Sequence, residues 1–323
     1  MPQLPLRSIL ALLSLCLWAA VSPAQTKPSA PAKLQVGVFT GHGAAQTCVE
    51  QAFESLRIDP QIEPRLVSAA DIASGGLAPL DALVLPGGGG GRQMNNLGDA
   101  AAAKVRDFVS EEGKGVVGLC AGAYMLTDTP GYPCLGLCGV SAVDREHDER
   151  GHGIVAFAPT PEGFEFFPEL KGKERYHLYY YEGPLLVPAA SGRPFEVLAT
   201  YVTDVHLEND APAGFMPGKR LFVRAEAGKG RAFLSSGHPE ATPGMRWMVP
   251  RMVRWVCRRE TIPYARSAVR PGAQAGETLF DEARRKEEAG LFEALLYGPA
   301  EGKLKAIRRL AEIRSWEAAK WIA

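Results

Sequence analysis

Two short motifs, far apart along the chain, carry residue types that together could do nucleophilic chemistry. The first is Gly-Leu-Cys-Ala-Gly at residues 118–122, in which a thiol stands between two glycines. The second is Ser-Gly-His-Pro-Glu at residues 236–240, in which an imidazole and a carboxylate are separated by one proline. A cysteine activated by a histidine, which a carboxylate orients, is suited to attack acyl carbon atoms. The motifs therefore predict a triad of Cys120, His238 and Glu240.

The predicted nucleophile, Cys120, stands where a short buried strand should pass into a helix. Residues 116–117 are two valines, typical of a buried strand, and residues 121–126 can begin a helix. Such a turn strains the backbone of the nucleophile and needs small neighbours, which Gly118 and Gly122 supply. The thiol would then project from the sheet at a helix N-terminus, whose dipole favours the thiolate. A buried structural cysteine is the alternative interpretation.

The predicted base, His238, should share one side of the backbone with its carboxylate. Pro239 holds His238 in an extended conformation, and residues i and i+2 of an extended chain point the same way. Glu240 can therefore orient the imidazole. Residues 231–235 before the motif read as a strand, which favours a triad over the alternative of a surface turn.

Acyl transfer also needs N–H donors for the oxyanion of its tetrahedral intermediate. The backbone amide of Ala121 is one candidate, and that of Gly87 or Gly88 is the other, because glycine lets the backbone approach a substrate closely. The glycine run at residues 87–91 is not a P-loop, since Arg92 follows it where a lysine is required. A flexible turn is the alternative for this run.

Other polar residues give weaker predictions. His42, in a turn after the first predicted strand, and Tyr124, after the cysteine, are candidates to line the pocket, although a plain turn histidine is an equal alternative for His42. His147 and His152 lie among acidic residues, but their spacing matches no metal motif. We therefore expect a solvated loop there, with no metal site and no cofactor.

Three more motifs extend the pattern: Phe-Thr-Gly at residues 39–41, Leu-Pro-Gly-Gly at 85–88 and Tyr-Tyr-Glu-Gly-Pro at 180–184. Together with the triad motifs they resemble the class I glutamine amidotransferase-like superfamily, and within it the biotin–protein ligase N-terminal-like branch, over about residues 34–260. The resemblance implies the fold and the triad. It does not imply glutamine as the substrate, because nothing after this segment resembles a synthetase domain that would receive ammonia.

The order of strand and helix patterns predicts the fold class. Strand patterns alternate with helix patterns up to residue 120, which indicates βαβ units. We expect an α/β, flavodoxin-like fold with a mostly parallel sheet, helices on both faces and the site at the carboxyl ends of the strands. Residues 130–218 hold several short alternating runs and predict a mixed-sheet extension with a hairpin over the site, before a closing helix at 245–257.

The N-terminus carries a predicted signal peptide at residues 1–24. It has a basic start, an apolar run too short for a comfortable membrane span, and Ser-Pro-Ala before the expected cleavage site. This predicts a periplasmic or secreted protein with no membrane attachment after cleavage; a signal anchor is the alternative.

The rest of the chain divides by composition. We expect a linker at residues 25–33, the α/β domain at 34–260, a second linker at 261–276 and a helical extension at 277–323. The extension weakly resembles one HEAT-type hairpin and could pack on the domain or on a protein partner; a plain C-terminal extension is the favoured alternative.

Export would make disulfides possible. Cys134 and Cys138 could pair locally, and Cys48 opens the first helix while Cys257 closes the last helix of the domain. Because a flavodoxin-like sheet places those two helices on one face, we expect a Cys48–Cys257 bridge, which would leave Cys120 as a thiol. The alternative is that no cysteine is oxidised.

Charge and motifs together define the predicted function. The 36 basic and 36 acidic side chains balance, which gives no electrostatic case for nucleic acid or an anionic membrane. We predict a stand-alone thiol hydrolase that cleaves an amide or ester of a small-molecule or peptide-like acyl substrate through a thioester. The alternative is a catalytically silent binding module whose C-terminal helices dock a partner.

Overall fold

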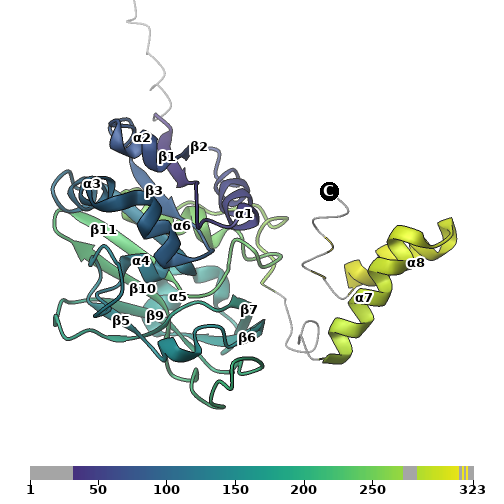
Figure 1. Cartoon of the computed structure of the whole chain (residues 1–323). Coiled ribbons are helices and arrows are strands. Elements are labelled where there is room, and N and C mark those ends of the chain that lie inside the picture. The colour runs from purple at the N-terminus through teal and green to yellow at the C-terminus, as the bar shows by residue number, and fades with distance from the viewer. Residues whose placement is uncertain (1–31, 272–281, 313–314, 316–317, 319–323) are drawn as a thin grey trace, which may run out of the picture. The chain divides into compact units, whose positions relative to one another are not determined.

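The computed structural model describes residues 32–271, 282–312, 315 and 318 (Figure 1). The predicted signal peptide at 1–24, most of the linker at 25–33 and the end of the linker at 261–276 lie outside the described residues. Within the described ranges, no helix combines the length and the apolar character that crossing a membrane would require.

Strands and helices alternate in the first part of the chain, and strands dominate its middle. The strands are β1 (Leu34–Phe39), β2 (Ile62–Val67), β3 (Ala82–Leu85), β4 (Gly115–Leu119), β5 (Val140–Val143), β6 (His152–Pro159), β7 (Tyr176–Tyr181), β8 (Leu185–Pro188), β9 (Glu196–Tyr201), β10 (Arg220–Ala227) and β11 (Gly230–Ser235). The helices are α1 (Gln46–Leu56), α2 (Ala69–Ala73), α3 (Gly90–Ser110), α4 (Ala121–Leu126), α5 (Pro161–Phe166), α6 (Met248–Val256), α7 (Glu282–Tyr297) and α8 (Ala300–Glu312), with short 3-10 helices η1 (Arg145–His147) and η2 (Pro168–Leu170).

Five strands form a parallel core in the order β2-β1-β3-β4-β11. Counted within this core, that is the 2-1-3-4-5 order of flavodoxin-like folds. The predicted fold class is therefore confirmed. All five strands run the same way, so their carboxyl ends meet at one edge of the sheet, where the chain passes from β4 into α4 and leaves β11.

Both faces of the parallel core are covered by helices. Successive residues of β3 point to opposite faces: Val84 packs in the cluster that contains residues of α1 and α6, and Leu85 packs in the cluster that contains residues of α3. Every residue of β3 is buried, which explains why its sequence is apolar throughout rather than alternating.

The remaining strands form an antiparallel extension, defined here as β5 to β10. β10 pairs antiparallel with β11, and the order continues through β9 and β6 to β7, while β5 and β8 pair beside β10. The sheet therefore continues from the parallel core into the mixed extension expected between residues 130 and 218. The end of β7 returns toward the site, because the Tyr179 carbonyl accepts a hydrogen bond from the His238 amide at 2.8 Å.

The C-terminal helices α7 and α8 pack on each other around a small cluster of their own. Leu310 and Ala318 are buried there against the partly buried Leu291, Phe292 and Leu295. The break at residues 298–299, Gly-Pro, falls between the helices, as the sequence predicts.

The predicted disulfides need correction, because Cys48, Cys134, Cys138 and Cys257 all carry thiols. The residues of α1 and α6 do share one hydrophobic cluster, as expected. Both helices follow parallel strands and run back along the sheet in the same direction. The start of α1 therefore lies at the carboxyl ends of the strands, and the end of α6 lies at their amino ends. Accordingly, Cys48 lines the pocket described below, whereas the Cys257 thiol contacts the Asp81 carbonyl at the start of β3, 3.6 Å away.

Candidate functional site

Cys120 occupies the strained turn that the sequence predicts between β4 and α4. Its φ and ψ are 52° and −109°, a backbone conformation that non-glycine residues rarely adopt. A Cβ on Gly118 would lie 2.4 Å from the Gly122 carbonyl oxygen, and one on Gly122 would lie 1.9 Å from that of Leu85. Glycines are therefore sterically required on both sides of the cysteine.

The imidazole of His238 is held by the carboxylate of Glu240. The distance from Nδ1 of His238 to Oε1 of Glu240 is 2.7 Å, and both side chains are buried, with 3% and 0% exposed. The Tyr179 carbonyl fixes the backbone at His238, as noted above, and the Thr242 hydroxyl donates to the carbonyl of His238 at 2.7 Å. The other ring nitrogen, Nε2, is buried and has no hydrogen-bond partner among the described residues.

Cys120 and His238 line one pocket of about 330 Å³. Burial alone would lower the pKa of His238, but the charge of the neighbouring Cys120, together with the charge and hydrogen bond of Glu240, raises it well above its usual value. The Cys120 thiol itself donates to the Tyr181 carbonyl at 3.2 Å. The structure thus brings the three predicted triad residues into one site.

The predicted oxyanion donors are divided between the pocket wall and its support. Gly88 and Ala121 line the pocket, and neither amide donates a hydrogen bond to the backbone of another described loop or turn. Gly87 lies behind them: a Cβ there would be 3.0 Å from Cε1 of His238 and 2.8 Å from Sγ of Cys48. Gly87 therefore leaves room for the imidazole, and Gly88 and Ala121 are the two predicted oxyanion donors that line the pocket.

The two predicted pocket residues have different outcomes. Tyr124 lines the pocket, where burial raises the pKa of its hydroxyl, and its ring lies 5.5 Å from that of Tyr132. His42 is exposed and is not among the residues that line the pocket, which corrects that prediction. The reason is the tight turn around it, in which Gly43 packs against the backbone of Arg92 and Gln93 and leaves the His42 side chain outside.

Four charged residues of the pocket were not predicted from the sequence as site residues. Arg92 enters from the start of α3, Asp148 and Glu149 from the loop between β5 and β6, and Glu182 from the end of β7. Glu182 has a positive φ of 54°, and burial, followed by the charges of Glu149, Glu208 and Asp148, raises its pKa to about 7. The signal for Glu182 lay in the motif at residues 180–184, but that motif alone gives the residue no role.

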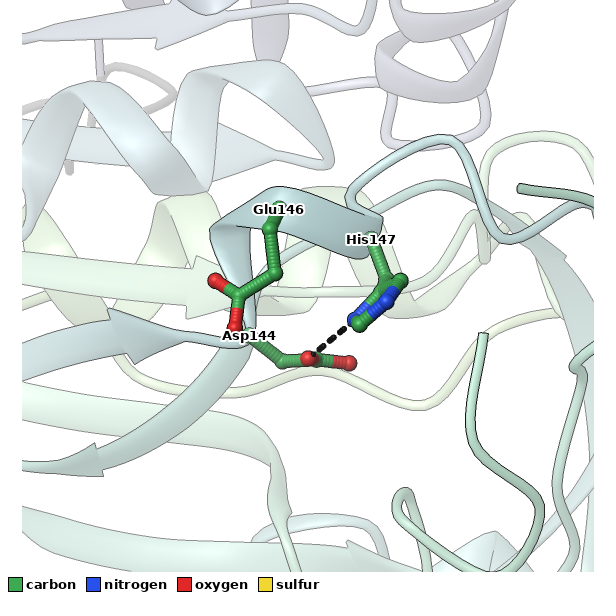
Figure 2. A group of neighbouring side chains, drawn as sticks. All are labelled: Asp144, Glu146 and His147. Carbon is green, nitrogen blue, oxygen red and sulfur yellow. Dashed lines mark hydrogen bonds and ion pairs between the residues drawn. The ribbon is translucent and has the colours of Figure 1, made fainter. Parts of the chain in front are cut away.

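A separate group of potential metal ligands lies on the loop after β5. Figure 2 shows Asp144, Glu146 and His147 side by side, with one ligand atom from each within 4.8 Å of the others. Asp144 is already engaged by the His147 ring at 2.7 Å and by the buried Arg150 guanidinium. A cation would have to compete with Arg150, so the arrangement is that of an ion-pair network.

Comparison with known proteins relates the first part of the chain to one family. Residues 34–131 match the family model described as biotin-protein ligase, N terminal. No curated protein matches the chain. The matched segment spans β1 to the loop after α4, and so contains Cys120 and the glycine run but ends before His238.

Several solved structures are similar to the chain at low sequence identity. PurLQS from Thermotoga maritima is 18% identical over 70% of this chain and 98% of its own, with a TM-score of 0.46. A ThuA-like protein from Parabacteroides merdae is 12% identical over 74% and 99%, with a TM-score of 0.49. The glutaminase domain of Trypanosoma brucei CTPS, solved with bound acivicin, is 11% identical over 72% and 97%, with a TM-score of 0.45.

The family match and the strand order agree with each other. Similarities to solved structures at such low identities and TM-scores say nothing about the reaction of this chain. The fold class rests instead on the order of the strands in the parallel core. The family match agrees with the resemblance predicted from the motifs: residues 34–131 match the biotin-protein ligase, N terminal, family model, and the chain has an α/β fold with the strand order of flavodoxin-like folds.

Proposed function

We propose that the chain is a stand-alone thiol hydrolase that cleaves an amide or ester through a thioester on Cys120. The observation that carries this proposal is the buried His238, which is bonded to Glu240 through Nδ1 and faces the Cys120 pocket with an unpartnered Nε2. A structural cysteine would need neither a strained backbone nor a buried, carboxylate-oriented imidazole beside it.

The reaction begins with transfer of the Cys120 proton to Nε2 of His238, which its raised pKa favours. The thiolate attacks the acyl carbon, a C–S bond forms, and the amides of Gly88 and Ala121 receive the oxyanion. When the intermediate collapses, the amine or alkoxide leaves with the proton from His238. Water, deprotonated by His238, then attacks the thioester, the C–S bond breaks, and the acid and the thiol are released. Glu240 orients the ring throughout.

The principal test is the reactivity of Cys120 toward iodoacetamide at neutral pH, measured by mass spectrometry for each cysteine. We expect Cys120 to react faster than Cys134, which lies outside the pocket and whose pKa is raised by burial. His238→Ala should slow Cys120 at least about 100-fold and leave Cys134 unchanged. A panel of acyl electrophiles, with Cys120→Ala as the control, would then narrow the acyl group.

A catalytically silent binding module is the second candidate, and the pair of helices α7 and α8 favours it, because they form a compact unit that could dock a partner. The same alkylation experiment separates the two candidates. If Cys120 reacts no faster than Cys134, and His238→Ala changes nothing, the hydrolase proposal is wrong and the binding module is favoured.

We also propose that the protein is exported to the periplasm or out of the cell, because residues 1–24 have the pattern of a cleaved signal peptide. N-terminal sequencing of the protein from fractionated cells tests this. We expect a mature chain that starts at Gln25, outside the cytoplasm; a cytoplasmic chain that keeps its first residues would contradict export.

A further inference from the structure

The wall of the pocket carries more negative than positive charge. Asp148, Glu149 and Glu182 line it, and Arg92 is the one lysine or arginine among the residues that do so. None of these three carboxylates forms an ion pair or a side-chain hydrogen bond within the described part of the chain. By contrast, the nearby Asp144 is bonded to both His147 and Arg150. The three carboxylates of the pocket are therefore not paired directly with a cationic side chain, although Arg92 lines the same pocket.

Of the three carboxylates that line the pocket, Glu182 is the one whose backbone neighbour contacts Cys120. The carbonyl of the preceding residue, Tyr181, accepts a hydrogen bond from the Cys120 thiol at 3.2 Å. The following Gly183 packs so closely on the Ser236 carbonyl that a Cβ there would lie 1.7 Å from it, which fixes the backbone on both sides of Glu182. Its side chain is half-buried. Burial raises its pKa most, and the negative charges of Glu149, Glu208 and Asp148 raise it further.

A second feature of the same pocket independently calls for a ligand. His238 lines the pocket and is only 3% exposed. Its Nε2 atom has no hydrogen-bond partner in the described ranges. In the proposed mechanism this atom receives the Cys120 proton and gives it to the leaving group, so the leaving group of a substrate would bind beside it. The pocket thus has a reactive end at Cys120 and His238 and an acidic wall beside it.

The acidic wall is built for an organic cation rather than a single metal ion. Among the described residues, the one group of three potential ligands whose atoms all lie within 4.8 Å of one another is Asp144, Glu146 and His147. The carboxylates of Asp148, Glu149 and Glu182 are not that close together. Dispersed carboxylates suit an ammonium or guanidinium group, which spreads its donors in several directions.

We propose that the pocket selects acyl substrates that carry a positively charged organic group, an ammonium or a guanidinium, bound by Glu182 with the support of Asp148 and Glu149. The inference rests on the proposed function, because it assigns a substrate class to the same site. Glu182 acts here as a specificity residue, and the bond-breaking steps remain those of Cys120 and His238.

Three chloroacetamides of similar size and different charge test this inference. The chloroacetamide of ethylenediamine is cationic, that of ethanolamine is neutral and that of glycine is anionic. The second-order rate of Cys120 alkylation by each is measured by mass spectrometry on the full chain. We expect the rates to fall in the order cationic, neutral, anionic, with about tenfold between the first two, as for an ion pair in a partly buried site.

Substitution and salt then locate the charge responsible. Glu182→Gln should reduce the ratio of cationic to neutral rates to about one to two, while Glu111→Gln, which removes an exposed carboxylate at the end of α3, should keep the native ratio. High salt should also lower the native ratio, a measurement that needs no variant. If Glu182→Gln fails to fold, the exposed Glu149→Gln should give a smaller reduction in the same direction.

Three other outcomes would each contradict the charge selection, the assignment to Glu182 or both proposals. If all three reagents alkylate Cys120 at equal rates that exceed those at Cys134, the charge selection is wrong and the hydrolase proposal stands. If the cationic preference is present but unchanged in both Glu182→Gln and Glu149→Gln, the assignment to this wall is wrong. If no reagent distinguishes Cys120 from Cys134, both the inference and the hydrolase proposal fall.

Discussion

The parallel core and the antiparallel extension contribute different kinds of residue to the pocket. The core supplies Cys120, His238 and the two amides, from loops at the carboxyl ends of its strands. The extension supplies other residues that line the same pocket: Asp148, Glu149, Tyr181 and Glu182. Under the two proposals above, reactivity would therefore depend on the parallel core, and selection among substrates would depend on the antiparallel extension.

This separation has a physical reason. Parallel strands place successive loops at one edge with little freedom, which suits atoms that must meet within hydrogen-bond distance. Long loops between antiparallel strands can change in sequence and length without disturbing the core. The proposed site should therefore respond to mutations in two ways: changes in the core should alter the rate for every substrate, and changes in the extension should alter the preference among substrates.

The largest effect is expected from removal of the nucleophile in the core. Cys120→Ala should abolish acyl transfer, with a loss of about 10⁴-fold or more, because no other thiol can form the thioester at that carbon. Turnover of whichever ester or amide the electrophile panel identifies is the measurement. The matched control, Cys48→Ala, removes the other thiol of the pocket; an equal loss there would assign the nucleophile to the wrong residue.

Glu240→Gln, also in the core, should lower turnover by about 10²–10³-fold, because the amide can no longer stabilise the imidazolium. The pKa of His238 should fall as well, since Glu240 is one of the groups that raise it. NMR titration of the ring protons reports the pKa, and kinetics with cationic and neutral substrates reports the rate. A change in preference without a change in rate would contradict the separation of roles.

Two buried arginines of α6 allow the connection between the halves to be broken selectively. Arg251 reaches the extension, where its guanidinium binds Glu169 of η2 at 2.6 and 2.7 Å. Arg254 stays within the core and binds Asp59, 2.9 Å away, before β2. Arg254→Met should lower the free energy of unfolding by about 3–5 kcal/mol, because it leaves the buried Asp59 carboxylate without its cationic partner. Arg251→Met should lower it by about 2–3 kcal/mol, because Glu169 is partly exposed to water.

Urea denaturation measures both losses, and hydrogen exchange locates them. Arg251→Met should speed exchange in β7 while β1 and β3 stay protected. Equal exchange throughout the sheet in that variant would mean that the two halves unfold as one unit.

The smallest effect is a dependence of substrate preference on pH. Glu182 has a pKa raised to about 7, so its carboxyl is mainly neutral below that pH and mainly charged above it. The preference of Cys120 for the cationic chloroacetamide over the neutral one should therefore increase severalfold from about pH 6 to about pH 8. The ratio cancels the titration of the cysteine itself. Glu182→Gln should flatten the profile; a ratio that decreases with pH would contradict the assignment.

Much of the core could be predicted because its signals are local. The strand at residues 34–39 and the turn at Cys120 follow from apolar runs and glycine positions that leave few alternatives. Glycine positions can also mislead about where a helix begins: α3 begins at Gly90, and Gly98, with φ of 65°, bends the helix instead of starting it. The glycine run therefore ends in the first turn of α3.

The strand pairing within the extension and the positions of the cysteines could not be predicted for a different reason. β5 and β8 are four residues long and gain their pairing from β10 and from each other, so their short runs carry little signal alone. The predicted bridge between Cys48 and Cys257 was wrong because two helices on the same face of a sheet can hold their cysteines at opposite ends of the strands. The role of Glu182 depends on which distant carboxylates face it, and no spacing along the chain encodes that.

Strand β7 holds both halves of the site in register. Its Tyr179 is bonded through the backbone to His238 and through its amide to the Thr242 hydroxyl, and its last carbonyl, at Tyr181, receives the Cys120 thiol. Inserting or deleting a single residue there would turn every following side chain to the other face of the sheet. The backbone contacts to Cys120 and His238 would then be lost together. A laboratory library that seeks new specificities should therefore randomise position 182 and leave the length of the strand untouched.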